Sequence, residues 1–344
     1  MKARYSRRKV SAALLGAVAG SLAGSRVVFA QTPETSSPVA VSGDALFAGV
    51  TLEEGVAPTI HGDVALPATV ERVVTITDGA VDAMTAVGVT PVGVTASSNF
   101  ESVAAYLEGQ VSGDVAYVGG WSELDIEAII GLNPDLILAD RYVADDQYVL
   151  LSDVAPVIAT GEIEVPGPAD LQQWEYELLV WGHAVGKLPE AKEAILGLRE
   201  RAARIQASAG ERVGESVVVF RPQPDFPVVM SHAWITGVML TWAGFRGNEL
   251  TERTPPPHSG NSVSLEQLNL LDADWLLAAT RNEEMSAALE SYLENPVFQS
   301  LTAVEEGSIV QVSGDLWSGA TGVLAGHAML DDIERILIDG DTGR

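Results

Sequence analysis

Hydrophobic and polar positions follow two regular patterns along the chain, and the order of these patterns predicts the fold. Short apolar runs, such as residues 72–77 and 136–139, are too short for helices and too apolar for half-exposed strands, so they indicate buried parallel strands. Segments with apolar residues at helical spacing, such as residues 79–87, lie between them. Strands and helices that alternate in this way predict an α/β protein built on parallel sheets.

One helix–turn–strand unit occurs twice, at residues 121–140 and again at residues 262–280. When the two copies are aligned without a gap, Glu127 falls on Glu266. Each copy opens on a helix-start signal, continues through a short amphipathic helix and ends in a buried apolar run. The duplication predicts two similar α/β lobes.

The segment between the two lobes is predicted to be helical. Residues 170–185 have helical periodicity, and Pro189 occupies a first-turn position. The helix that it opens has about 20 residues and spans about 30 Å, enough to join two lobes rigidly. We therefore expect an N-terminal lobe at 58–168, a helical region with the interlobe helix at 169–212, and a C-terminal lobe at 213–340.

The N-terminal region has the features of an export signal. Residues 1–30 contain six basic residues and no acidic residue, with an apolar stretch too short to span a membrane. The Arg7-Arg8 pair suggests a twin-arginine signal, with a general secretory signal as the alternative. Residues 31–57, rich in Thr, Ser, Pro, Val and Gly, are expected to form a flexible tether. We therefore expect a periplasmic or secreted protein.

Composition narrows the possible functions. The sequence of 344 residues contains no cysteine, which excludes disulfides, thiolate metal sites, iron–sulfur clusters and a lipid anchor on cysteine. Its formal net charge of −27 disfavours nucleic acid and anionic lipid as partners and favours solubility in a salty or acidic setting. No nucleophile elbow, phosphate loop, His-Glu-x-x-His or paired-carboxylate motif is present, so we do not expect an enzyme.

Several fragments, in their order and spacing, resemble the substrate-binding proteins of ABC importers for ferric siderophores, cobalamin and haem. The resemblance covers about residues 61–337. It is carried by Pro67 with RVVTI, Asn133-Pro134-Asp135-Leu136-Ile137, Ser264-Leu265-Glu266-Gln267-Leu268, Asn295-Pro296-Val297-Phe298, and Trp317 followed by Leu330-Asp331-Asp332-Ile333. The resemblance implies two Rossmann-like lobes with parallel sheets, joined by a single long α-helix, with the ligand in the cleft between them.

The resemblance also implies a function and partners. The C-terminal fragment looks most like the ferric-siderophore branch, so we expect a monomeric protein that captures a ferric siderophore and delivers it to an ABC importer permease. No catalytic residue, resident cofactor or protein-bound metal is expected. In this family each lobe offers an acidic residue to the permease, and Glu127 and Glu266 are the candidates here. Stabilisation of a helix dipole is the alternative role for both.

The rule that ligands sit outside the carboxyl ends of parallel strands selects the candidate binding residues. A ferric siderophore presents oxygen atoms and an organic shell, which suit guanidinium donors and aromatic faces. The candidates are Phe100, Trp121, Arg141, Tyr142, Arg221, His232, Trp234 and Trp317. Arg221 is the first choice, because it follows a buried strand in a chain poor in basic residues; a salt bridge to an acid is its alternative role.

Two other ligands remain open within the same fold. Haem requires a histidine or tyrosine as axial ligand, and His232 or Tyr142 is available for that role. Cobalamin is the other possibility. A free zinc or manganese ion is disfavoured, because the histidines are scattered and no pair has ligand spacing.

Overall fold

The computed structural model describes residues 43–97, 102–111, 114–120, 123–141, 143, 145–161, 163–167, 170–253 and 262–342. The chain divides into Met1–Glu34 and Thr35–Arg344, and all the described residues belong to the second unit. The predicted export signal lies outside the described residues, as do the candidate ligand residues Phe100, Trp121 and Tyr142.

Six strands form the sheet of the N-terminal lobe, in the order β6-β5-β4-β3-β7-β8. They are Val73–Thr75 (β3), Gly93–Ala96 (β4), Ala116–Gly120 (β5), Glu123–Leu124 (β6), Leu136–Ala139 (β7) and Val157–Ala159 (β8). All neighbours pair in parallel except β5 and β6. Every residue of β3, β4, β7 and β8 is buried, because both faces of the sheet are covered.

Four short helices accompany this sheet: Asp78–Ala86 (α2), the 3₁₀ turn Ala105–Leu107 (η1), Ile126–Leu132 (α3) and Asp145–Ser152 (α4). Thr77 is the N-cap of α2, and its hydroxyl accepts the N–H of Ala80 at 3.2 Å. Helix α4 was not predicted, since its sequence has no apolar stripe at helical spacing.

The sheet of the C-terminal lobe has four strands in the order β10-β9-β11-β12. They are Val217–Pro222 (β9), Pro227–Val229 (β10), Trp275–Thr280 (β11) and Ile309–Ser313 (β12). Strands β9, β11 and β12 pair in parallel, and β10 pairs antiparallel with β9. Two separate, mainly parallel sheets confirm the predicted α/β class.

Short helices also surround the second sheet. They are Gly210–Arg212 (η2), Ile235–Trp242 (α7), Glu249–Arg253 (α8), Leu265–Leu271 (η3), Glu283–Leu293 (α9), Pro296–Gln299 (α10), Thr302–Glu305 (α11), Gly314–Gly319 (α12), Val323–Asp332 (α13) and the π-helical Ile333–Ile338 (η4). The second copy of the repeated unit contains the 3₁₀ helix η3, where an α-helix was expected.

One aspartate in each copy of the repeat has the same structural role. Asp135 precedes β7, and its Oδ2 accepts the N–H groups of Glu71 and Arg72, both at 2.9 Å, just before β3. Asp274 precedes β11, and its Oδ2 accepts the N–H of Ser216 at 2.6 Å and its hydroxyl at 2.7 Å, just before β9. Each carboxylate therefore fastens its strand to the start of the adjacent parallel strand.

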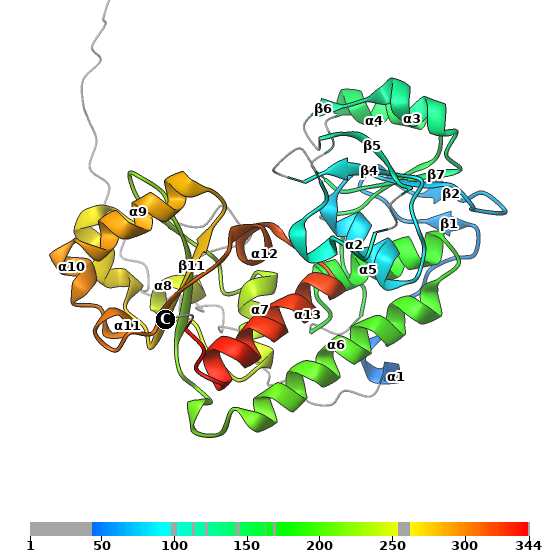
Figure 1. Cartoon of the computed structure of the whole chain (residues 1–344). Coiled ribbons are helices and arrows are strands. Elements are labelled where there is room, and N and C mark those ends of the chain that lie inside the picture. The colour runs from blue at the N-terminus through cyan, green and yellow to red at the C-terminus, as the bar shows by residue number, and fades with distance from the viewer. Residues whose placement is uncertain are drawn as a thin grey trace, which may run out of the picture. The chain divides into compact units, whose positions relative to one another are not determined.

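Two helices connect the lobes, Gln173–Ala184 (α5) and Leu188–Ser208 (α6). The 21 residues of α6 correspond to about 31 Å, and α6 extends from α5 toward the helices of the C-terminal lobe (Figure 1). Its buried stripe of Ile195, Leu198, Ala202 and Ile205 belongs to one apolar cluster that contains side chains of both lobes. The connection is therefore stiffened by packing as well as by its helical backbone.

The prediction that residues 31–57 form a flexible tether is contradicted for residues 43–57. Residues Gly43–Leu46 form helix α1, and Val56–Ala57 (β1) pairs antiparallel with Val64–Ala65 (β2). Leu46 is fully buried in the main apolar cluster. His183 Nε2 lies 2.9 Å and 3.0 Å from carbonyl oxygens of this segment. The segment is ordered because it supplies apolar anchors that its mixed composition conceals.

Candidate ligand-binding site

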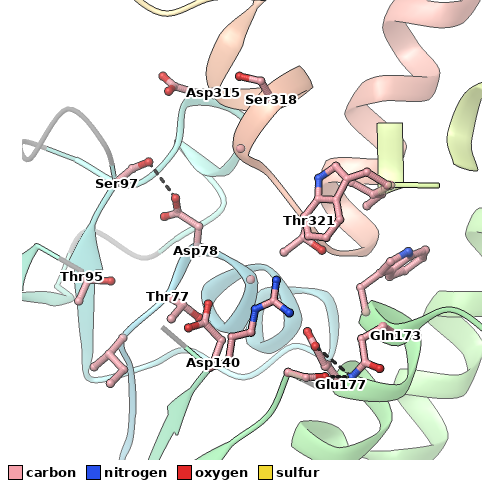
Figure 2. A pocket seen from close by; sticks show the side chains of 18 of the residues that line it. Thr77, Asp78, Thr95, Ser97, Asp140, Gln173, Glu177, Asp315, Ser318 and Thr321 are labelled. Carbon is pink, nitrogen blue, oxygen red and sulfur yellow. Dashed lines mark hydrogen bonds between the residues drawn. The ribbon is translucent and has the colours of Figure 1, made fainter. Parts of the chain in front are cut away.

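A cavity of about 400 Å³ lies where the carboxyl ends of both sheets face one another (Figure 2). A cavity of this size falls in the range of small-molecule sites. More than half of its lining residues carry hydroxyl, amide or charged side chains, and many of these lie at or just after the ends of strands. They include Thr77 and Asp78 after β3, Thr95 and Ser97 at the end of β4, Asp140 and Arg141 after β7, Arg221 in β9, Arg281 after β11, and Asp315 and Ser318 in α12.

Three arginines from both lobes line this cavity. Arg141 belongs to the N-terminal lobe, whereas Arg221 lies in β9 and Arg281 directly follows the adjacent parallel strand β11. Burial lowers the pKa of Arg221, and the positive charge of Arg281 adds to that effect. A guanidinium nevertheless stays protonated in proteins. The two C-terminal arginines therefore hold like charges close together, an arrangement that favours an anionic ligand.

Acidic groups compensate part of this charge. Arg281 Nε lies 3.5 Å from Asp315 Oδ1 and donates to the carbonyl of Gly314 at 3.3 Å. In the N-terminal lobe, the Ser97 hydroxyl donates to Asp78 Oδ2 at 2.8 Å (Figure 2). Burial raises the pKa of Asp78, and the hydrogen bond from Ser97 opposes that rise. Asp78 Oδ1 is buried and has no hydrogen-bond partner within the described part of the chain.

The structure brings together Arg141, Arg221 and Trp234 of the predicted set. All three line the cavity. Trp174 is buried and also forms part of the cavity wall. The cavity therefore combines guanidinium groups with two indole side chains.

The structure does not bring two of the predicted ligand contacts to the cavity. Trp317 was expected in a loop, but it lies in α12, is fully buried and donates from Nε1 to Asp332 Oδ2 at 2.8 Å. His232 does not line the cavity; its Nε2 forms a hydrogen bond of 2.8 Å with Thr241 Oγ1. Burial lowers the pKa of His232 to about 4, so it is neutral at physiological pH. Both side chains serve packing.

Sequence reasoning missed Arg281 and the acidic groups of the wall. Arg281 follows β11 almost as Arg141 follows β7, so the repeat itself contained the signal. The acids carried no such signal, since Asp78 resembles a helix-start residue and Glu177 is one polar position of α5. Their proximity to the arginines arises only from the fold.

A buried carboxylate links the two lobes beside the cavity. Asp82, on α2, is fully buried; its Oδ1 accepts the N–H of Leu324 at 3.1 Å and its Oδ2 that of Ala325 at 2.8 Å. Both donors belong to the first turn of α13. Gly322 precedes them with φ of +125°, and a Cβ there would lie 2.4 Å from the Asp82 carboxyl. Burial raises the pKa of Asp82 to about 7.

The two proposed docking acids lie at equivalent helix starts. Glu127 is in the first turn of α3 and Glu266 in the first turn of η3, and both are exposed.

None of the helices in the described part of the chain is long and apolar enough to cross a membrane. The described residues also contain no group of three or more His, Asp or Glu side chains placed to hold a metal ion.

Two α/β lobes with mainly parallel sheets, a stiff connecting helix, and a cavity at the strand ends that is lined by charged and apolar side chains define a two-lobed ligand-binding protein. The periplasmic binding protein family matches residues 73–316, and the chain belongs to this family.

Relatives and solved structures agree with this assignment. The achromobactin-binding periplasmic protein of Dickeya dadantii is 29% identical over 275 residues, which cover 77% of this chain and 86% of the relative. The Fe(3+) dicitrate-binding periplasmic protein FecB of Escherichia coli is 28% identical over 302 residues, covering 85% and 94%. The fold is similar to that of Staphylococcus aureus SirA complexed with staphyloferrin B, with a TM-score of 0.70, 21% identity and coverage of 82% and 98%.

Proposed function

We propose that this protein captures a ferric siderophore or a related ferric chelate in the cavity between its lobes and delivers it to an ABC importer. The observation that carries the proposal is the convergence of Arg141, Arg221 and Arg281 on one cavity at the strand ends of both lobes. The binding of ferric dicitrate and of achromobactin by relatives that cover most of this chain supports the same conclusion.

The chemistry of the wall suits such a cargo. A ferric chelate surrounds its iron with oxygen atoms, so the protein needs donors for those oxygens rather than ligands for the metal. Guanidinium groups donate in a planar fork that matches carboxylate and other oxyanions, and they bind more strongly than neutral donors. Trp174 and Trp234 offer faces for the organic part of the chelate. The protein would hold its ligand without transforming it.

Haem is not favoured as the ligand. Of its two candidate axial ligands, His232 does not line the cavity, while Tyr142 lies outside the described residues. The relatives reported above are named for binding achromobactin and Fe(3+) dicitrate.

Delivery requires contact with a permease, and we assign that contact to Glu127 and Glu266. Their exposed carboxylates occupy matching positions in the duplicated unit, one on each lobe. Replacing both with arginine should abolish chelate uptake by cells while leaving the affinity of the isolated protein unchanged. A loss of affinity instead would contradict a docking role.

The proposal also includes export of a monomer through the twin-arginine-like signal, without a lipid anchor, since the sequence contains no cysteine. Replacing Arg7 and Arg8 with lysine should leave the precursor in the cytoplasm. Unchanged export of that variant would favour the general secretory route instead.

Tryptophan fluorescence tests ligand capture directly, because Trp174 and Trp234 line the cavity. The protein is titrated with ferric citrate, a ferric triscatecholate, a neutral ferric trihydroxamate, and iron-free citrate as a control. Saturable quenching by one ferric chelate, and not by iron-free citrate, is the expected result.

Two variants establish where that chelate binds. Arg221→Gln should weaken the response, whereas Arg253→Gln, a matched change at an exposed position outside the cavity, should not. The proposal fails if none of the three chelates quenches, or if both variants respond like the wild type.

A further inference from the structure

The cavity presents an electrostatic conflict to an anionic chelate. Its arginines attract such a ligand, but four carboxyl groups line the same space: Asp78, Asp140, Glu177 and Asp315. A like charge close to a carboxylate disfavours its ionised form, so a carboxyl that faces the ligand must be paired with a cation or take up a proton. Asp315 has Arg281 at 3.5 Å, which leaves the carboxyls of the N-terminal lobe and α5 to be considered.

Glu177 is the carboxyl whose surroundings best suit a proton. It projects from α5 into the cavity, and Gln173 Nε2 donates to its Oε1 over a long 3.4 Å (Figure 2). Gln173 Nε2 also donates to the carbonyl of Gly161. Among the described residues, Glu177 forms no ion pair. Its carboxyl is thus anchored by a neutral group and turned toward the ligand space.

Charged groups on several elements act on Glu177. Burial raises the pKa of Glu177 to about 8, and the hydrogen bond from Gln173 opposes that rise. The negative charge of Asp140 raises the pKa further, and the positive charge of Arg141 lowers it. The same cavity is also lined by Asp78 on α2 and, from the other lobe, by Arg221, Arg281 and Asp315. At neutral pH Glu177 is therefore mainly an uncharged acid with an O–H to donate.

We propose that Glu177 is a specificity-determining residue whose neutral carboxyl donates a hydrogen bond to an oxygen of an anionic ferric chelate, so that capture is coupled to proton uptake. This inference rests on the proposed function, because the ligand is the same ferric chelate. An anionic ligand adds a further negative charge beside Glu177 and stabilises its protonated form. Above pH 8 the free protein must first bind a proton, and its affinity declines.

The size of the effect follows from linkage. If only the protonated form binds, raising the pH from 7 to 9 across a pKa of about 8 should lower the affinity by about tenfold. Glu177→Gln keeps a neutral donor of nearly the same shape at every pH, so this decline should be absent from the variant. Glu193→Gln, on the exposed side of α6 and outside the cavity, is the matched control and should behave like the wild type.

The experiment is calorimetric titration with ferric citrate and with a ferric triscatecholate, both anionic, at pH values from 6 to 9. Comparison of wild type with Glu177→Gln cancels any change in the chelates themselves. Titrating the wild type at pH 8 in two buffers of different ionisation enthalpy counts the protons taken up and requires no variant. The expected results are a net proton uptake and a tenfold decline in affinity, the latter confined to the wild type and the Glu193→Gln control.

The outcomes separate this inference from the proposed function. Binding of an anionic chelate with the same pH profile in wild type and Glu177→Gln, and no proton uptake, overturns the role of Glu177 and leaves the proposed function standing. If the protein binds only the neutral trihydroxamate, the role of Glu177 is likewise overturned and the proposed function stands. Failure to bind any ferric chelate at any pH overturns both.

Discussion

Replacing Asp82 with alanine should loosen the attachment of α2 to α13 and markedly destabilise the protein. Asp82 is fully buried and accepts two N–H groups from the first turn of α13. These hydrogen bonds connect the two lobes. Alanine offers no acceptor, so both donors would be left buried without a partner. Because an unsatisfied buried donor costs about 1–3 kcal/mol, the pair should cost about 2–6 kcal/mol.

Asp125 provides a matched control. It caps α3 by accepting the N–H of Ala128 at 2.9 Å, but it is exposed to solvent, which can replace it. Asp125→Ala should therefore cost only about 0.5–2 kcal/mol, the usual value for a lost helix cap. Both variants are compared with the wild type by equilibrium urea denaturation at pH 7, with the slopes checked for equal cooperativity. If Asp82→Ala costs no more than Asp125→Ala, the buried carboxylate does not hold the lobes together.

The pH dependence of the free energy of unfolding gives a second test of the role of Asp82. Burial raises the pKa of Asp82 from 3.8 to about 7 in the folded protein. Between these values the folded protein holds a proton that the unfolded chain has released, so the contribution of Asp82 to stability decreases as pH rises from about 4 through about 7. Asp82→Asn cannot titrate, so the stability of the wild type relative to this variant should decrease as pH rises over that range. A constant difference would refute the reasoning.

Three further predictions concern the site, the core and the surface. Arg281→Gln should weaken chelate binding by about tenfold or more, since a charge-assisted hydrogen bond contributes about 1.5–3 kcal/mol; unchanged affinity by calorimetry would remove Arg281 from the site. Trp317→Phe should lose the bond to Asp332 and about 1–3 kcal/mol of stability with no change in chelate affinity; weaker binding would restore its predicted ligand role. Raising NaCl to about 1 M should raise the melting temperature, because screening relieves the repulsion of a net charge of −27; a decrease would contradict this.

Much of the fold could be predicted because parallel sheets leave a strong local signal. Strands β7 and β11 are covered on both faces, so their apolar runs and their repeat are visible in the sequence. Helix α6 is long and carries a regular apolar stripe, which fixed its place between the lobes. Helices α4 and α8 are short and lack such a stripe, so tertiary contacts decide their structure.

The site was predictable only where position along a strand implies position in space. That rule identified Arg141 and Arg221, and its application to the second copy of the repeat would have identified Arg281. Trp317 was misplaced because a tryptophan beside glycines resembles a loop residue, while its indole in fact packs inward from α12. The protonation of Glu177 depends on burial by distant segments, which no local pattern encodes.

The most direct test of the central claim is to locate the iron. Crystals of the protein grown with ferric citrate, or with whichever ferric chelate quenches its fluorescence, are measured at the iron absorption edge. The account predicts one anomalous peak inside the cavity, with Arg141, Arg221 and Arg281 directed at oxygens of the chelate and no side chain ligating the metal. Iron bound directly by protein side chains, or located outside this cavity, would contradict it.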